Sequence, residues 1–259
     1  MLILLTNDDG VHSAGLQALA DEMQSLGRVV VVAPDRERSA VGHALTLHSP
    51  LRAEEIQANK WAVSGTPTDA VSLGVYGLLK EKPALVVSGI NKGANMGDDL
   101  TYSGTVAAAM EATLMGVPAI AISLASKTFS YDDFRHAAVV ARQLAETVLD
   151  HGLPADTFIN VNVPDSAPLG IRLTRQGKRV YEDAVVQNCD PRGRIYYWIG
   201  AGELSFQNLD GTDFHAVQNG YVSVTPLHLD LTNYAAMDRL RQWKLEEKSL
   251  PDTKSGSES

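Results

Sequence analysis

Two adjacent carboxylates, Asp8 and Asp9, follow directly after a short apolar run at residues 2–5. An unbroken apolar run of this kind is typical of a buried strand. Open parallel sheets bind their ligands at the carboxyl ends of such strands. Two carboxylates crowded there repel each other, and a divalent cation that prefers oxygen ligands, Mg²⁺ or Mn²⁺, would relieve the repulsion. The alternative is that both residues only cap a turn and the following helix.

Ser39 and Asn91 are expected at the same edge of the sheet, because each follows a further apolar run. Asn91 lies in a stretch rich in glycine and asparagine, residues 88–99, which is longer than a simple turn requires and therefore favours a functional loop over an ordinary turn. Together with Asp8 and Asp9, these residues would offer two carboxylates, a hydroxyl and an amide oxygen to one octahedral ion. Such a set leaves positions for water and for a phosphate oxygen.

Ser103, Gly104 and Thr105 precede an alanine-rich segment that is predicted to be helical to about Met115. Ser103 or Thr105 can cap this helix, and the free N–H groups at a helix N-terminus attract anions. Ser-Gly-Thr caps also occur without a ligand, so the position just after residues 88–99 is what gives this one weight. At such a site the metal ion would polarise a phosphoryl group and activate water, and the helix N-terminus would neutralise the other phosphate oxygens. This combination predicts phosphate hydrolysis.

Four further residues have two interpretations each. His12 could shuttle a proton or be a hydrogen-bonded structural group. Lys92 could help to hold phosphate or could face solvent. Arg36 and Arg38 could reach phosphate or nucleotide, or could pair with the acidic residues beside them.

Two other functions compete with metal-dependent hydrolysis. A phosphatase of the haloacid dehalogenase type uses an aspartate nucleophile and needs an Asp-x-Asp spacing after the first strand, whereas Asp8 and Asp9 are adjacent. A non-catalytic sensor of nucleotide or metal would use the same edge for binding alone.

The elements that must position these residues alternate between strand and helix. Apolar runs predict strands at residues 2–5, 28–33, 84–87, 118–123 and 157–163. Helical spacing and caps predict helices at 14–26, from 67 to about 79, at 103–115 and at 134–150. Short strands at 47–53 and 61–64 are predicted to form a hairpin. This alternation predicts an α/β fold with a doubly wound, mostly parallel, Rossmann-like sheet.

The pattern changes beyond Pro164. Residues 180–200 are rich in Val, Tyr, Ile and Trp and predict a long β-hairpin with its turn at 190–193, and strands at 171–175 and 220–226 and a helix at 232–243 are also predicted. The aromatic and aliphatic side chains of this hairpin must pack against another surface, which favours exchange of the hairpin with a second subunit. We predict a catalytic core at 1–165, an extension at 166–245 within the same overall domain, and a disordered tail at 246–259.

Composition narrows the function classes. A net charge of −9 and a pI of about 5.2 argue against a binder of nucleic acid polymers. Cys189 is the only cysteine, which excludes an intramolecular disulfide framework and fits a reducing compartment. No run approaches the roughly 20 apolar residues that span a bilayer, and no signal peptide pattern is found, so we expect a cytoplasmic protein without membrane contact.

Five segments resemble the signature segments of the SurE family, the survival-protein nucleotidases. They are TNDDGVHSAG at 6–15, APDRERSA at 33–40, SGTPTDA at 64–70, SGINKGANMGDD at 88–99 and YSGTVAAAMEA at 102–112. The resemblance covers most of the first 165 or so residues, and more loosely the hairpin, last strand and last helix. It implies a metal-dependent phosphatase acting on nucleoside 5′- and 3′-monophosphates and sometimes on short polyphosphate. It also implies a homodimer or homotetramer built through exchanged C-terminal elements.

The resemblance also assigns site residues. It places the ligands of one divalent ion per subunit, Mg²⁺ or Mn²⁺, on Asp8, Asp9, Ser39 and Asn91, with the two aspartates at the centre of catalysis. It places the groups that bind phosphate on Asn95, Ser103, Gly104 and Thr105. The residues after Ser39, at 40–43, differ among relatives and leave the base preference open, and Lys92 stands where the family often has a neutral residue.

Overall fold

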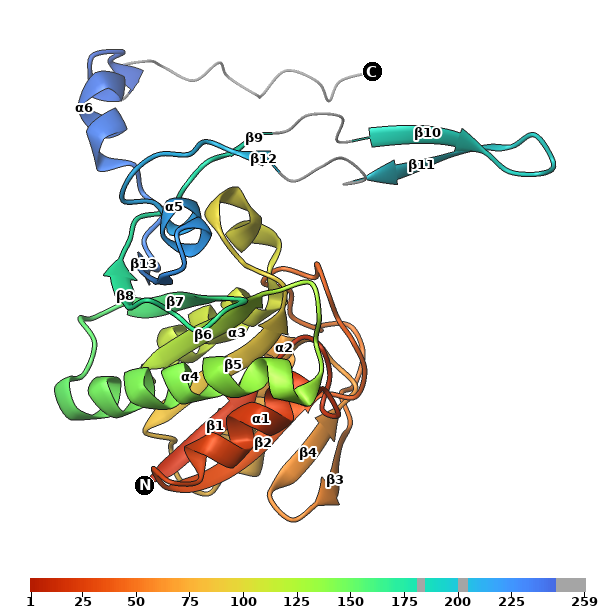
Figure 1. The fold of residues 1–259 in the computed structure, drawn as a ribbon, viewed down its shortest axis with the longest axis vertical. Helices are drawn as coiled ribbons and strands as arrows, with labels where there is room; N and C mark the ends of the chain where they lie inside the picture. Colours follow the sequence, from red (N-terminus) through yellow and green to blue (C-terminus); the bar gives the residue numbers. More distant parts are fainter. Residues whose placement is uncertain (181–184, 200–204, 246–259) are drawn as a thin grey trace, which may run out of the picture. The chain divides into compact units, whose positions relative to one another are not determined.

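The structure is a computed structural model that describes residues 1–180, 185–199 and 205–245 (Figure 1). The chain divides into two compact units, one of residues 1–229 and one that begins at Asp230. The second unit contains α6, Tyr234–Arg241, which is capped by Asn233. The predicted division into 1–165 and 166–245 stays a prediction, and the predicted tail at 246–259 lies outside the described residues.

Within the described residues, a sheet of nine strands forms the centre of the first unit, in the order β3-β4-β2-β1-β5-β6-β7-β13-β8. Neighbouring strands are parallel except for the pairs β3/β4 and β7/β13. The predicted doubly wound, mostly parallel sheet is therefore confirmed. The strands are β1 Leu2–Thr6, β2 Arg28–Pro34, β3 Ala53–Gln57, β4 Lys60–Val63, β5 Leu85–Lys92, β6 Ala119–Ala125, β7 Thr157–Pro164, β8 Ile171–Leu173 and β13 Val222–His228.

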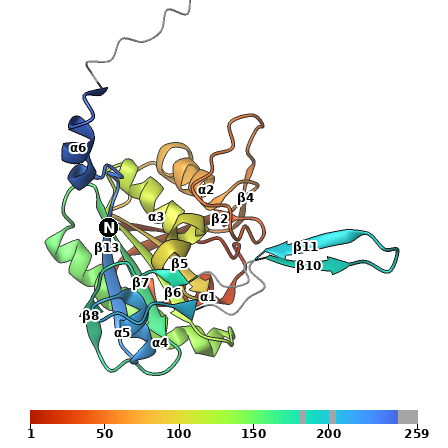
Figure 2. The same cartoon turned by 90° about the horizontal axis from the view of Figure 1, so that it is seen from above.

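Helices cover both faces of this sheet (Figure 2). On one face α1, Ala14–Met23, and α4, Tyr131–His151, pack with the sheet in one hydrophobic cluster. On the other face α2, Pro67–Leu73, and α3, Gly104–Leu114, form a second cluster. Because the central strands are covered on both sides, their sequences are apolar without alternation.

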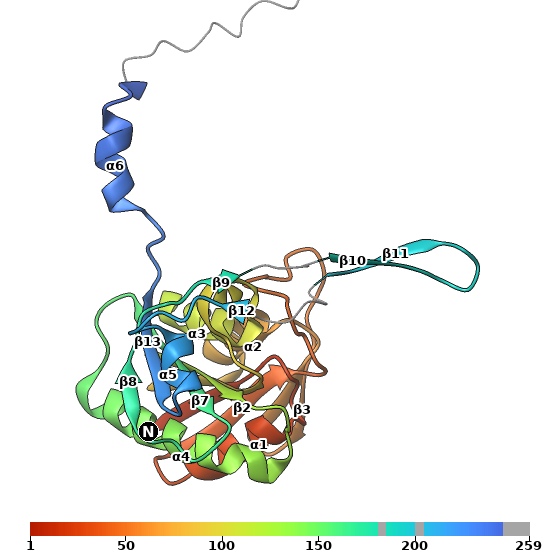
Figure 3. The same cartoon turned by 45° about the horizontal axis from the view of Figure 1, so that its top comes forward.

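The remaining helical segments are short. A π-helical turn, Gly74–Leu78, follows α2, and a 3-10 helix, Gly97–Tyr102, precedes α3. Helix α5, Asp213–Gln218, packs against β13 (Figure 3). Among the described residues, no helix is long and apolar enough to cross a membrane.

Some predicted boundaries were wrong. The strand predicted at 47–53 lies instead at Ala53–Gln57, because the hairpin turns tightly at Asn59, whose φ is +61°. Strand β5 continues to Lys92, so Asn91 lies on a strand and not in a loop. The pairing of β5 with β6 shifts register between Ser88 and Asn91 and then resumes, which local periodicity does not reveal. Helix α1 ends at Met23 rather than near residue 26, and α5 was not predicted.

The predicted hairpin is confirmed within the described part of residues 180–200. Strands β10, Val185–Cys189, and β11, Ile195–Ile199, pair in antiparallel register on either side of a turn beginning at Asp190. Every side chain of β11 is exposed, including Trp198 at 61%. A second short pair joins β9, Arg179–Val180, to β12, Ser205–Phe206.

Candidate functional site

The turn after β1 presents the two aspartates, and Asn7 fixes its shape. The Asn7 side chain accepts from the N–H of Gly10 at 3.2 Å and donates to the Gly10 carbonyl at 3.1 Å and to the Ser13 hydroxyl at 2.7 Å. Gly10 has a φ of +96°, and a Cβ there would lie 3.0 Å from the backbone of Arg36. The turn therefore requires glycine and lies directly against the loop that follows β2.

That second loop positions Ser39. The N–H of Arg38 donates to the carbonyl of Asp8 at 2.7 Å, so the two loops are joined beside the first aspartate. The Ser39 hydroxyl donates to Glu37 at 2.8 Å. A hydroxyl that donates in this way keeps its oxygen lone pairs for a cation.

Asp8 is 4% exposed and contacts the start of α3. One carboxylate oxygen accepts from the Thr105 hydroxyl at 2.6 Å and the other from the Thr105 N–H at 3.2 Å. Burial raises the pKa of Asp8 above its usual value, although these hydrogen bonds act in the opposite direction. A Cβ at Gly104 would lie 2.9 Å from the Cβ of Asp8, so only glycine fits. The structure thus directs the Thr105 hydroxyl to Asp8, and its role toward phosphate stays a prediction.

Asp9 lies beside the end of β5. Its carboxylate accepts from the N–H of Lys92 at 3.1 Å, and the Lys92 ammonium lies 3.8 Å from its other oxygen. Burial, and then the charge of Asp8, raise the pKa of Asp9 to about 6. The Asn91 amide donates to the Gly93 carbonyl at 2.8 Å, which leaves its amide oxygen as the end that can act as a ligand.

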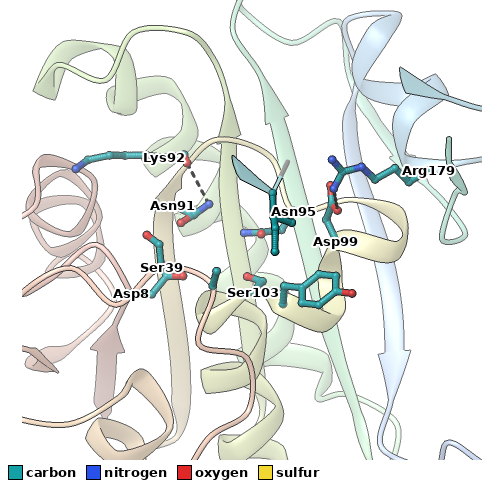
Figure 4. A pocket seen from close by; sticks show the side chains of 11 residues that line it. Asp8, Ser39, Asn91, Lys92, Asn95, Asp99, Ser103 and Arg179 are labelled. Carbon is teal, nitrogen blue, oxygen red and sulfur yellow. Dashed lines mark hydrogen bonds and ion pairs between the residues drawn. The ribbon is translucent and has the colours of Figure 1, made fainter. Parts of the chain in front are cut away.

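One cavity of about 520 Å³ joins these elements (Figure 4). Of the predicted site residues, it is lined by Asp8, Ser39, Asn91, Asn95 and Ser103. Asp9, Gly104 and Thr105 are not part of the lining but contact residues at its wall. The volume suits a small ligand, since such pockets measure about 300–1,000 Å³.

The far side of the cavity contains residues that the sequence did not single out as site residues. Arg179 forms an ion pair with Asp99 there, and Tyr102 and Ile199 complete the wall. Asp98, beside this pair, accepts from the Arg179 N–H at 3.1 Å. Arg179 is 80 residues from Asp99 in sequence, so no local pattern could have linked them.

The residues with two interpretations are now placed. Lys92 lines the cavity. Arg36 and Arg38 approach the Asp35 carboxylate to 3.7 and 3.8 Å, so they pair with an acidic neighbour. His12 is exposed and is not part of the cavity wall.

The donor set fits a hard divalent cation. Among the described residues, no group of three or more His, Cys, Asp or Glu side chains that could hold a metal ion is found. Two carboxylates, a hydroxyl and an amide oxygen are instead the ligands of Mg²⁺ and Mn²⁺. The ionised forms of Asp8 and Asp9 are penalised by burial, and a dication beside them would compensate for that penalty.

Known proteins resemble this chain along nearly its whole length. Residues 3–183 match the family model of the survival protein SurE. A relative from Syntrophotalea carbinolica named 5′-nucleotidase SurE is 63% identical over 245 residues, which cover 95% of this chain and 98% of that relative. A relative of the same name from Geobacter sulfurreducens is 61% identical over 248 residues, covering 95% and 94%.

A solved structure gives the same result. The crystal structure of the SurE protein from Aquifex aeolicus matches with a TM-score of 0.84 and 47% sequence identity, and covers 94% of this chain and 100% of that one. The sequence and the fold both agree with those of the relatives over nearly the whole chain. The chain belongs to the SurE family.

Proposed function

We propose that the chain is a divalent-metal-dependent 5′-nucleotidase, which hydrolyses nucleoside 5′-monophosphates to nucleoside and phosphate. The observation that carries this proposal is the single cavity where Asp8, Ser39, Asn91, Asn95 and Ser103 meet. The names of the relatives support the same activity. Nucleoside 3′-monophosphates and short polyphosphate are proposed as further substrates.

Asp8, Asp9, Ser39 and Asn91 would hold one ion, Mg²⁺ or Mn²⁺, in each subunit. Such an ion supplies polarisation of the phosphoryl group and activation of a water molecule when it is bound. Thr105 holds Asp8 in one orientation through its hydroxyl and its N–H. The carboxylate thereby stays aimed without reorganisation during turnover.

Asn95, Ser103 and the first turn of α3 would bind the phosphate. The Ser103 oxygen accepts from the N–H of Val106 at 3.1 Å, so its own hydroxyl hydrogen is available for a phosphate oxygen. The N-terminus of α3 adds the positive end of its helix dipole, while the N–H groups of Thr105 and Val106 donate to Asp8 and Ser103. On the far side, the ring of Tyr102, which is 59% exposed, offers an apolar surface for the nucleoside.

Neither alternative function is favoured. The adjacent Asp8 and Asp9 do not give the Asp-x-Asp spacing of an aspartyl phosphatase, and failure to trap an aspartyl-phosphate would agree with this. A sensor would bind nucleotide without turnover. Release of phosphate from AMP or GMP that needs Mg²⁺ or Mn²⁺ and stops with a chelator is expected for the enzyme. Binding of AMP without release of phosphate under any of these metals would overturn the proposal.

We also propose assembly as a homodimer or homotetramer. The support is β11, where Ile195, Tyr196, Tyr197, Trp198 and Ile199 are all exposed. Aromatic and aliphatic side chains grouped on one strand are the usual material of an interface. A cytoplasmic location is proposed from composition, since the only cysteine, Cys189, is free.

A further inference from the structure

Asn160 and Asn162 lie on β7 and are wholly buried, each 0% exposed. Since side chains alternate along a strand, these two share one face of the sheet. A strand covered on both faces is ordinarily apolar, because a buried amide without partners is costly. The partners of these two asparagines therefore indicate why the strand contains them.

Both partners are main-chain atoms of Asn95. The Asn95 N–H donates to the Asn162 oxygen at 2.8 Å, and the Asn95 carbonyl accepts from the side-chain amides of Asn162 and Asn160, each at 2.9 Å. The Asn95 side chain is held as well, since its amide donates to the Ser123 hydroxyl at 2.8 Å. Asn95 is thus fixed at its backbone and at its side chain.

The anchoring residues belong to the rigid part of the sheet. In register, Asn91 of β5 pairs with Ser123 of β6, which pairs with Asn162 of β7, so the three form one row across neighbouring strands. Asn95 itself lies between β5 and the 3-10 helix, outside regular structure, and is 8% exposed at the cavity wall. Without the row, its position would depend on an irregular segment.

We propose that Asn162 and Asn160 are positioning residues for the reaction: they hold the Asn95 backbone so that its side chain faces the phosphate. The inference rests on the proposed function, in which Asn95 contacts phosphate. Asn162 makes two of the three bonds and is the more important of the pair. Asn160 makes one bond, and within the described residues its side-chain oxygen has no hydrogen-bond partner.

The test is a double-mutant cycle between Asn162→Leu and Asn95→Ala, with AMP hydrolysis in Mn²⁺ and inorganic phosphate binding by calorimetry as readouts. Asn162→Leu is expected to lower kcat/KM about 10–100-fold and to weaken phosphate binding in parallel. In the Asn95→Ala background the same substitution should change both by less than about twofold, because the residue that it positions is gone. Asn160→Leu should give a smaller loss, about two- to fivefold, and the same dependence on Asn95.

Ser223→Ala is the matched control. Ser223 is a buried polar residue that pairs with Asn162 in register on β13 and bonds to Thr174 rather than to Asn95. It should leave phosphate binding unchanged. Equal losses for Asn162→Leu in both backgrounds, or a matching loss in the control, would overturn the inference.

Two further outcomes have a defined meaning. If Asn162→Leu does not fold, Asn160→Leu decides, because it removes one bond together with an unpaired oxygen and is expected to fold. If the wild-type protein binds phosphate but hydrolyses no nucleotide, the proposed function fails. The calorimetric cycle then still supports or overturns the positioning of Asn95.

Discussion

Replacing Asp8 with asparagine should remove most of the stability that the protein gains from bound metal, while the fold stays intact. The side chain is buried and keeps nearly the same volume, so no cavity forms. Thr105 loses one of its two acceptors on Asp8, at a cost of about 1 kcal/mol. Removing the buried charge relieves the burial penalty on Asp8 and acts in the opposite direction in the metal-free protein. In the wild type, metal at one hundred times its Kd adds about 2.7 kcal/mol, or roughly 5–11 °C in Tm for a chain of this size.

The variant should lose most of the stabilisation by metal because it lacks the negative charge of Asp8. A unit charge removed about 4 Å from a second charge is worth about 4 kcal/mol at an effective dielectric of 20, so a hundredfold weaker Kd is a conservative expectation. At the same metal concentration the variant should then gain only about 0.4 kcal/mol, or roughly 1–2 °C. Phosphate release should fall on the order of 1,000-fold.

The assay is thermal unfolding with and without Mn²⁺, alongside phosphate release from AMP. Asp213→Asn is the control, because Asp213 is also a wholly buried carboxylate with a pKa raised by burial, yet it does not line the cavity. It should lower Tm and keep the metal-dependent shift. A full shift in Asp8→Asn would refute the reasoning and remove Asp8 from the ligand set.

The remaining predictions concern single substitutions at Glu111, Thr105 and Trp198. Hydrogen bonds from His43 and Ser72 hold the pKa of Glu111 below its usual 4.5, so this carboxylate stabilises the fold above about pH 4.5 and loses that effect as pH falls through the lowered value. In urea unfolding, Glu111→Gln should therefore be less stable than the wild type by about 1–3 kcal/mol at pH 7, and the difference should shrink below pH 4.5. A difference that stays constant with pH would contradict this. Thr105→Val should weaken Mn²⁺ binding about tenfold in calorimetry, because the 2.6 Å bond that orients the buried carboxylate is lost; unchanged affinity would show that Asp8 needs no such support. Trp198→Ser on β11 should shift the mass measured by light scattering toward smaller species, whereas an unchanged mass would count against an interface there.

The sequence by itself determined the order of the strands and helices up to Pro164 and the edge where chemistry could occur. A strand that is buried on both faces has an unbroken apolar sequence, so the segment alone indicates the strand, as at β1 and β2. Caps are equally local: Ser103 caps α3 and Thr66 caps α2 through contacts three residues away. The parallel alternation then places the strand ends at one edge, which is why the sequence alone could group Asp8, Ser39 and Asn91, all three of which line the cavity.

Only the tertiary structure decided how the site residues are held. The anchoring of Asn95 joins residues 65 and 67 positions apart, and the ion pair of Arg179 with Asp99 spans 80. Such contacts depend on strand order and register, which no local pattern encodes. The extension of β5 past its register shift was missed for the same reason. Short-range preferences therefore determined which elements form, whereas packing across the sheet decided which side chains meet.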